Sequence, residues 1–227
     1  MPKSLRTIVL LFAMLTAWVQ ADHVIITGGP AIRHWEDLRV KDDQHDRFWA
    51  NFVRASTLRM DEITKAYGAD AKIVWIVYQP AYRLRGKEDS KPYTTWISEI
   101  TAKRRATLIW VNSGSDLIRA INSRPGGSIQ TLDYFGHSNR HAFLLDYSCD
   151  ILGASTAWLH ENDLSRIKSS VFARNAYCKS WGCHTGESMS AKWKSATGYA
   201  MEGAKGPTTY TTISFGRLPE VRGSWVR

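Results

Sequence analysis

One histidine and one cysteine each follow an alternating, apolar stretch, and their types suit them to act as a base and a nucleophile. His137 ends the run S-I-Q-T-L-D-Y-F-G-H-S-N at 128–139, and Cys183 stands in the turn G-C-H-T-G that follows the run 171–182. A thiol needs a base or a positive neighbour to become a thiolate at neutral pH, and an imidazole can later protonate a leaving group. The pair therefore predicts nucleophilic catalysis by Cys183, with His137 as its base.

The neighbouring residues complete the predicted site. The backbone N–H groups of Ser138 and Cys183 are candidates for an oxyanion hole. Asp133, Asp146 and Asp150 could line a pocket for a basic substrate side chain, and the alternative is that all three are ordinary loop acids. Thr185 is a candidate substrate contact, or a cap for the helix that follows it. We expect no metal or organic cofactor, because the sequence has no C-x-x-C pair and adjacent Cys–His residues chelate poorly.

Two short motifs around these residues resemble those of a known superfamily. The turn G-C-H-T-G-E-S-M resembles the C-x-S-G-x-M turn of legumain-type peptidases and the C-x-[ST]-G turn of other caspase-like cysteine peptidases. F-G-H-S-N resembles their histidine turn, in which a glycine usually stands where this chain has Ser138. The histidine segment also precedes the cysteine segment, as in that superfamily. The resemblance implies a caspase-like three-layer α/β/α sandwich and a catalytic dyad of Cys183 and His137.

The elements expected around the two motifs alternate between strands and helices. A long helix over 47–67 carries an apolar stripe that includes Phe48, Phe52, Ile63 and Tyr67. Segment 82–93, flanked by prolines, is charged and irregular and is expected to be a loop. The predicted strands are 23–27, 71–78, 107–111, 128–138, 171–182 and 208–215, and the predicted shorter helices are 115–123, 161–168 and 188–197. This alternation predicts an α/β fold with a mostly parallel sheet, whose carboxyl edge gathers functional residues.

Residues 1–21 have the pattern of a signal peptide rather than of the fold. Lys3 and Arg6 precede the apolar run 8–18, and Ala21 is a small residue at a cleavage position. The apolar run is too short to cross a bilayer, so we expect no stable membrane anchor after cleavage. The sequence therefore predicts a secreted or periplasmic protein whose single domain spans 22–227.

Charge and cysteine content restrict the partners and the covalent structure. The chain carries a formal net charge of +9, but its basic residues are scattered and form no arm of the kind that binds nucleic acid, so no nucleic-acid partner is expected. Three cysteines leave one unpaired in an oxidising compartment. With Cys183 as the nucleophile, Cys149 and Cys178 either pair or remain free thiols. The oligomeric state is left open.

These observations favour an exported cysteine peptidase that cleaves peptide or protein substrates through an acyl-enzyme. Two alternatives remain open. The first is an amidase or transpeptidase of the same fold that acts on cell-wall peptides. The second is a caspase-like scaffold without activity, which serves as a binding or toxin-like module.

Overall fold

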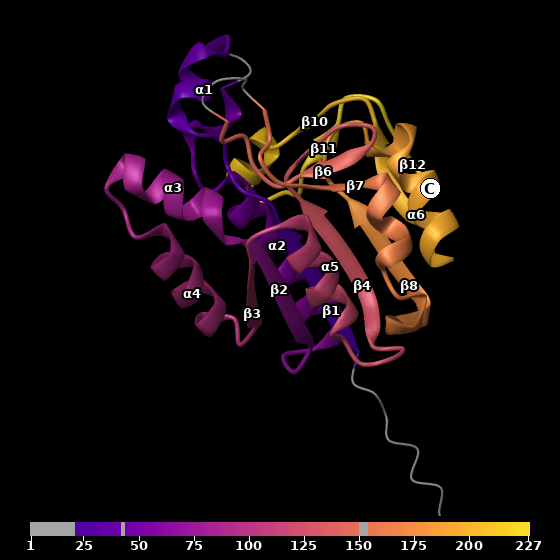
Figure 1. Cartoon of the computed structure of the whole chain (residues 1–227). Coiled ribbons are helices and arrows are strands. Elements are labelled where there is room, and N and C mark those ends of the chain that lie inside the picture. The colour runs from indigo at the N-terminus through magenta and orange to yellow at the C-terminus, as the bar shows by residue number, and fades with distance from the viewer. Residues whose placement is uncertain (1–20, 42–43, 150–153) are drawn as a thin grey trace, which may run out of the picture.

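A seven-stranded, mostly parallel sheet forms the centre of an α/β fold (Figure 1). The computed structural model describes residues 21–41, 44–149 and 154–227. The strand order is β12-β9-β8-β4-β1-β2-β3, and only β12 runs antiparallel to its neighbour. The strands are β1 (Asp22–Thr27), β2 (Lys72–Tyr78), β3 (Thr107–Val111), β4 (Ile129–Phe135), β8 (Phe172–Ser180), β9 (Met201–Lys205) and β12 (Ser224–Val226).

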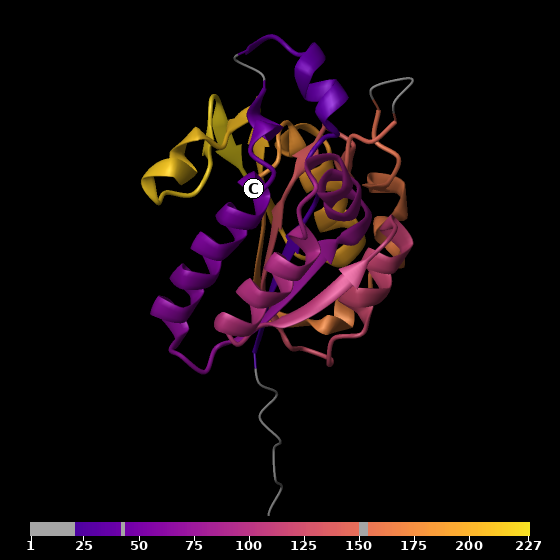
Figure 2. The same cartoon turned by 90° about the vertical axis from the view of Figure 1, so that its left-hand side faces the viewer.

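Helices cover both faces of the sheet, because its central strands are apolar on both faces. Ile25 and Trp75 pack on one face with α2 (Asn51–Tyr67) and α4 (Tyr93–Lys103). Val24 and Ile76 pack on the other face with α5 (Gly114–Asn122) and α6 (Met189–Thr197). Figure 2 shows the long helix α2 to one side of the sheet. The arrangement is compatible with a three-layer sandwich, and a near-continuous apolar strand such as β2 is typical of its centre.

Most of the segment 82–93 is helical, so its prediction as a loop is wrong except at residues 90–92, which link two helices. The helical part belongs to α3 (Gln79–Asp89) and to the start of α4. Pro80 stands in the first turn of α3, where the missing N–H costs no helical hydrogen bond. The charged residues are compatible with a helix because Arg85 and Asp89, four residues apart, form an ion pair at 3.0 Å.

Two further expectations need correction. Only Thr208–Thr209 of the predicted strand 208–215 is extended: it forms β10, which pairs with β11 (Glu220–Val221), and Thr211–Phe215 is the 3₁₀ helix η6. The predicted stripe of α2 is correct at Phe52 and Ile63, which are buried. Phe48 precedes the helix and Tyr67 ends it, and both are exposed, so the buried stripe is shorter than predicted.

Short elements cover the carboxyl edge of the sheet. A three-stranded antiparallel sheet contains β5 (His137–Ser138), β6 (Ala142–Leu144) and β7 (Trp158–His160). The helical turns are α1 (Arg33–Leu38), η2 (His45–Arg47), η3 (Glu161–Arg166) and η5 (Thr185–Glu187), while η4 (Ser169–Val171) directly precedes β8 and lies at the amino edge. In Figure 1, α1 lies beyond the edge toward which β4 points.

The predicted signal peptide, 1–21, lies outside the described residues except for Ala21, and Asp150 lies outside them as well. No helix within the described ranges has the length and apolar character needed to cross a membrane. Cys149, Cys178 and Cys183 are free thiols, so the possible disulfide between the first two is not formed.

Candidate functional site

The structure brings His137 and Cys183 to one cleft at the carboxyl edge of the sheet. Strands β4 and β8 are parallel neighbours, and His137 follows the end of β4 while Cys183 follows the end of β8. Both residues line the same cavity. Two distant segments therefore meet because adjacent parallel strands end at the same edge.

The imidazole of His137 is fixed on three sides. Its Nε2–H donates a 2.5 Å hydrogen bond to Oδ2 of Asp46. The rings of Phe52 and Tyr147 contact it edge-on, with centroids at 4.9 and 4.6 Å. Only 10% of the side chain is exposed. The hydrogen bond to Asp46 orients the imidazole, and the carboxylate favours a positively charged ring during proton transfer.

Asp46 is a site residue that the sequence did not reveal. It is fully buried in η2 and accepts the backbone N–H of Ala31 at 2.8 Å, through the same Oδ2 that binds His137. Its own N–H donates to Oε2 of Glu36 at 3.0 Å. Asp46 lies 91 residues before His137 in a segment without regular periodicity. A lone acid in such a segment carries no sequence signal for a partner so far along the chain.

Donors from the β10 segment surround the sulfur of Cys183. The backbone N–H of Thr208 donates to Sγ at 3.3 Å, and the Thr208 hydroxyl lies 3.4 Å from the same atom. A thiolate at Cys183 can accept both hydrogen bonds. This contact joins the nucleophile turn to a segment 25 residues further along the chain.

Ser138 joins the two motif turns. Its hydroxyl donates to the carbonyl of Cys183 at 2.7 Å. A Cβ on Gly182 would lie 2.1 Å from that hydroxyl oxygen, so glycine is required there. Ser138, which directly follows the histidine, thus holds the cysteine turn in place. His184, which follows the nucleophile, has a left-handed backbone with φ of 61°.

Of the two predicted oxyanion donors, the N–H of Cys183 is the better placed. Within the part of the chain that the structure describes, no hydrogen-bond acceptor is found for this N–H, and the residue lines the cleft. Ser138 pairs with Phe143 in the β5–β6 hairpin, and its side chain is committed to the Cys183 carbonyl. The cleft therefore offers a backbone donor beside the sulfur.

The predicted substrate contacts Asp133 and Thr185 do not face the cleft, and this expectation is wrong for both. Asp133 lies inside β4, fully buried, where it accepts hydrogen bonds from Nε of Arg59 at 3.0 Å and from Nε1 of Trp181 at 2.9 Å. Burial raises the pKa of Asp133, and the Arg59 guanidinium opposes that rise. Thr185 is also fully buried, and its hydroxyl donates to the carbonyl of Gly182 at 3.4 Å.

The wall of the cleft combines apolar and aromatic side chains with the three threonines at 208, 209 and 211 and a single permanent charge. Phe52, Pro207 and Tyr210 line it, and burial raises the pKa of Tyr210 well above its usual value, so this phenol stays neutral. Arg222 is the charged member of the lining, and its side chain is exposed. The cavity volume, ≈170 Å³, is below the roughly 300–1,000 Å³ typical of small-molecule pockets. It has room for one side chain of a longer substrate.

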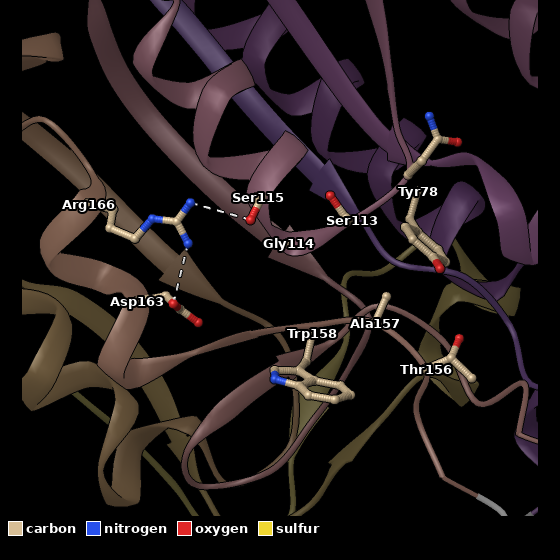
Figure 3. A pocket seen from close by; sticks show the side chains of 10 residues that line it. Tyr78, Ser113, Gly114, Ser115, Thr156, Ala157, Trp158, Asp163 and Arg166 are labelled. Carbon is tan, nitrogen blue, oxygen red and sulfur yellow. Dashed lines mark hydrogen bonds and ion pairs between the residues drawn. The ribbon is translucent and has the colours of Figure 1, made fainter.

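A second cavity opens beside the carboxyl ends of β2 and β3, but it contains no nucleophile and base. It is lined by polar groups near the start of α5 and by Trp158, a half-exposed residue. Figure 3 shows Arg166 held between Asp163 and Ser115, at 3.4 and 3.3 Å. Neither cysteine nor histidine lines this cavity. Among the residues with described positions, no three His, Cys, Asp or Glu side chains gather as a metal site would require.

No family model, no curated protein and no solved structure matches the chain. Any proposal about function therefore rests on the sequence motifs and on the geometry of this cleft.

Proposed function

We propose that this protein is an exported cysteine peptidase of the caspase-like type, with Cys183 as nucleophile and His137 as general acid and base. One observation carries the proposal. The imidazole of His137 is hydrogen-bonded by buried Asp46 at 2.5 Å and shares its cleft with Cys183. A nucleophile, a base and a group that orients the base are the arrangement that covalent catalysis requires.

The proposed reaction uses groups that line or support the cleft. The imidazole of His137 takes the thiol proton, and the Cys183 sulfur attacks the peptide carbonyl. The Cys183 N–H stabilises the oxyanion. The protonated imidazole, supported by Asp46, gives its proton to the leaving amine as the C–N bond breaks. Water, deprotonated by His137, then releases the acyl group and restores the thiol.

The caspase-like assignment is supported by the motifs and by the order of the strands. The segment with the histidine turn and the segment with the nucleophile turn form adjacent parallel strands, β4 and β8, in the middle of a sheet covered on both faces. Ser138 occupies the position of the usual glycine and uses its hydroxyl to bind the Cys183 turn. Export rests on residues 1–21 alone.

The cleft lining supports a substrate preference opposite in sign to the one expected from Asp133. Arg222 follows Val221, which pairs with Thr208, and the N–H of Thr208 bonds the nucleophile. A guanidinium binds a carboxylate through two parallel hydrogen bonds, and Arg222 is exposed to solvent where it lines the cleft. We therefore propose that the peptides cleaved by this enzyme carry an acidic residue next to the scissile bond.

A fluorogenic peptide library tests the proposal. The purified protein should cleave a subset of peptides, and Cys183→Ala should abolish cleavage, while Cys149→Ala, at a thiol outside the cleft, should keep it. Iodoacetamide should label Cys183 fastest, with a rate that depends on pH and on His137. Transfer of the acyl group to an added amine would favour the transpeptidase. No cleavage, with slow and equal labelling of the accessible thiols, would refute an enzyme and favour a binding module.

A further inference from the structure

The segment that carries Asp46 is held in place by a buried cation on another helix. Arg85 of α3 is fully buried. Its Nη1 donates to the carbonyl of Ala31 at 2.8 Å, and its Nη2 donates to the carbonyl of Arg47 at 3.2 Å. These carbonyls belong to the two ends of the segment 31–47. One guanidinium therefore bridges both ends of the segment.

The same two positions support the carboxylate that binds His137. The N–H of Ala31 donates to Oδ2 of Asp46 at 2.8 Å, and Asp46 directly precedes Arg47. Hydrogen bonds thus link Arg85 to the carbonyl of Ala31, the N–H of Ala31 to Asp46, and Asp46 to His137, with the Cα of Ala31 between its two peptide groups. Ala31 is therefore held through both of its flanking peptide groups, because its carbonyl accepts from Arg85 while its N–H donates to Asp46.

Arg85 is itself oriented by a network away from the cleft. Its Nε donates to Oδ2 of Asp89 at 3.0 Å, and the hydroxyl of Tyr93 donates to the same oxygen at 2.6 Å. Arg33 binds the other oxygen of Asp89. A guanidinium has a rigid, planar fork of donors, so fixing Nε leaves the two terminal nitrogens aimed at the two carbonyls. An ammonium on a flexible stem cannot reproduce this geometry.

We propose that Arg85 is a positioning residue for the cleft, which acts through Asp46 on the orientation of the His137 ring. The inference rests on the proposed function in part, since it assigns Arg85 to the same site. It adds a residue outside the cleft whose loss should change the chemistry more than the fold. Nothing in its sequence context, a charged stretch between two prolines, points to such a role.

The test is a double-mutant cycle between Arg85→Lys and Asp46→Asn, with Arg83→Lys on the exposed face of α3 as the control. The first readout is the rate of Cys183 alkylation by iodoacetamide as a function of pH, which needs no peptide substrate. The second is the ¹H NMR signal of the His137 Nε2–H in ¹⁵N-histidine-labelled protein. Peptide cleavage by the same variants is the third.

We expect Arg85→Lys to lower kcat about tenfold with little change in KM, to move the alkylation profile to higher pH, and to shift the His137 signal. The double variant should be no slower than Asp46→Asn alone, because both changes act through one carboxylate. Additive effects, or an alkylation profile and NMR signal like those of the wild type, would overturn the inference. Should Arg85→Lys fail to fold, Arg85→Gln, which keeps one donor, takes its place with the same expected results.

These readouts separate the positioning role from the peptidase proposal. A protein that cleaves no peptide, yet whose Cys183 alkylation responds to Arg85→Lys as it does to Asp46→Asn, would refute the peptidase and support the role of Arg85. Peptide cleavage that is lost in Cys183→Ala but unchanged in Arg85→Lys would support the peptidase and refute the role of Arg85. Arg83→Lys should match the wild type in all three measurements.

Discussion

Asp46→Asn is the change that most directly tests the base. The wild-type carboxylate accepts hydrogen bonds from both the Ala31 N–H and the His137 Nε2–H through Oδ2. An asparagine with its carbonyl oxygen in that place can still accept both bonds, so what is lost is the negative charge. Hydrogen bonds to charged groups contribute about 1.5–3 kcal/mol and those between neutral groups about 0.5–1.5 kcal/mol. The expected loss is therefore about 1–2 kcal/mol.

A loss of about 1.4 kcal/mol is a tenfold change in rate, so Asp46→Asn should lower kcat/KM about 5- to 30-fold. Asp46→Ala should be slower still, because it removes the whole hydrogen bond and leaves the buried N–H of Ala31 without its acceptor. The assay is cleavage of the best peptide from the library, with the alkylation rate of Cys183 as a second readout. Asp61→Asn, on the exposed side of α2, is the matched control.

Wild-type kcat/KM in a folded Asp46→Asn variant would refute this reasoning. It would show that the 2.5 Å contact holds the segment in place without helping the imidazole to carry a charge. Circular dichroism and melting curves of each variant separate this outcome from a loss of folded protein. Equal rates for Asp46→Asn and Asp46→Ala would likewise contradict the argument from charge.

Three further predictions concern the thiols, the charge of the cleft and the sheet. Iodoacetamide should label Cys183 at least tenfold faster than Cys178 in the native protein, because burial raises the pKa of the Cys178 thiol to about 12. Mass spectrometry measures the two labelling rates. Faster labelling of Cys178 would show that the nucleophile lies within β8. Arg222→Gln should lower kcat/KM about tenfold for peptides with an acidic residue next to the scissile bond, and should leave kcat/KM unchanged for peptides with a neutral residue there. An equal loss of kcat/KM for both kinds of peptide would rule out a carboxylate subsite. Arg59→Leu should lower the free energy of unfolding in denaturant by about 3–5 kcal/mol, because it leaves the buried carboxylate of Asp133 without its partner. Arg54→Leu, on the exposed face of the same helix, is the control and should change the stability little. Similar losses for both variants would show that the Arg59–Asp133 ion pair adds no stability.

The strands and the strand exits could be predicted because their signals are local. A short apolar run such as β2, or a G-C-H-T-G turn after a strand, needs no information from elsewhere in the chain. Parallel strands then bring their ends to one edge, which is enough to place His137 and Cys183 together. Errors arose where tertiary contacts outweighed the local pattern. The segment 82–93 looked irregular from its charges and prolines, yet most of it is helical, with Arg85 buried between two backbone carbonyls.

The parts of the site that escaped prediction are those made by pairs distant in sequence. Asp46 meets His137 across 91 residues, and Thr208 meets Cys183 across 25. Neither contact follows from periodicity, because both arise where loops fold over the end of the sheet. Asp133 shows the opposite error. It is near the histidine in sequence, but it lies inside a central strand, where burial and an Arg59 ion pair remove it from any substrate.

The candidate site combines residues placed by the sheet with residues supplied by loops, and these two groups can change independently. The sheet fixes where the sulfur and the imidazole stand, since both are attached to strands buried on both faces. The loops decide what surrounds them: Asp46 comes from the segment 31–47, and Arg222 comes from the hairpin that also bonds the sulfur through Thr208. Changes in these loops can alter the strength of the base or the charge of the substrate without disturbing the core. The positioning role of Arg85 then follows the same logic, because a loop that supplies a catalytic support needs its own rigid attachment to the fold.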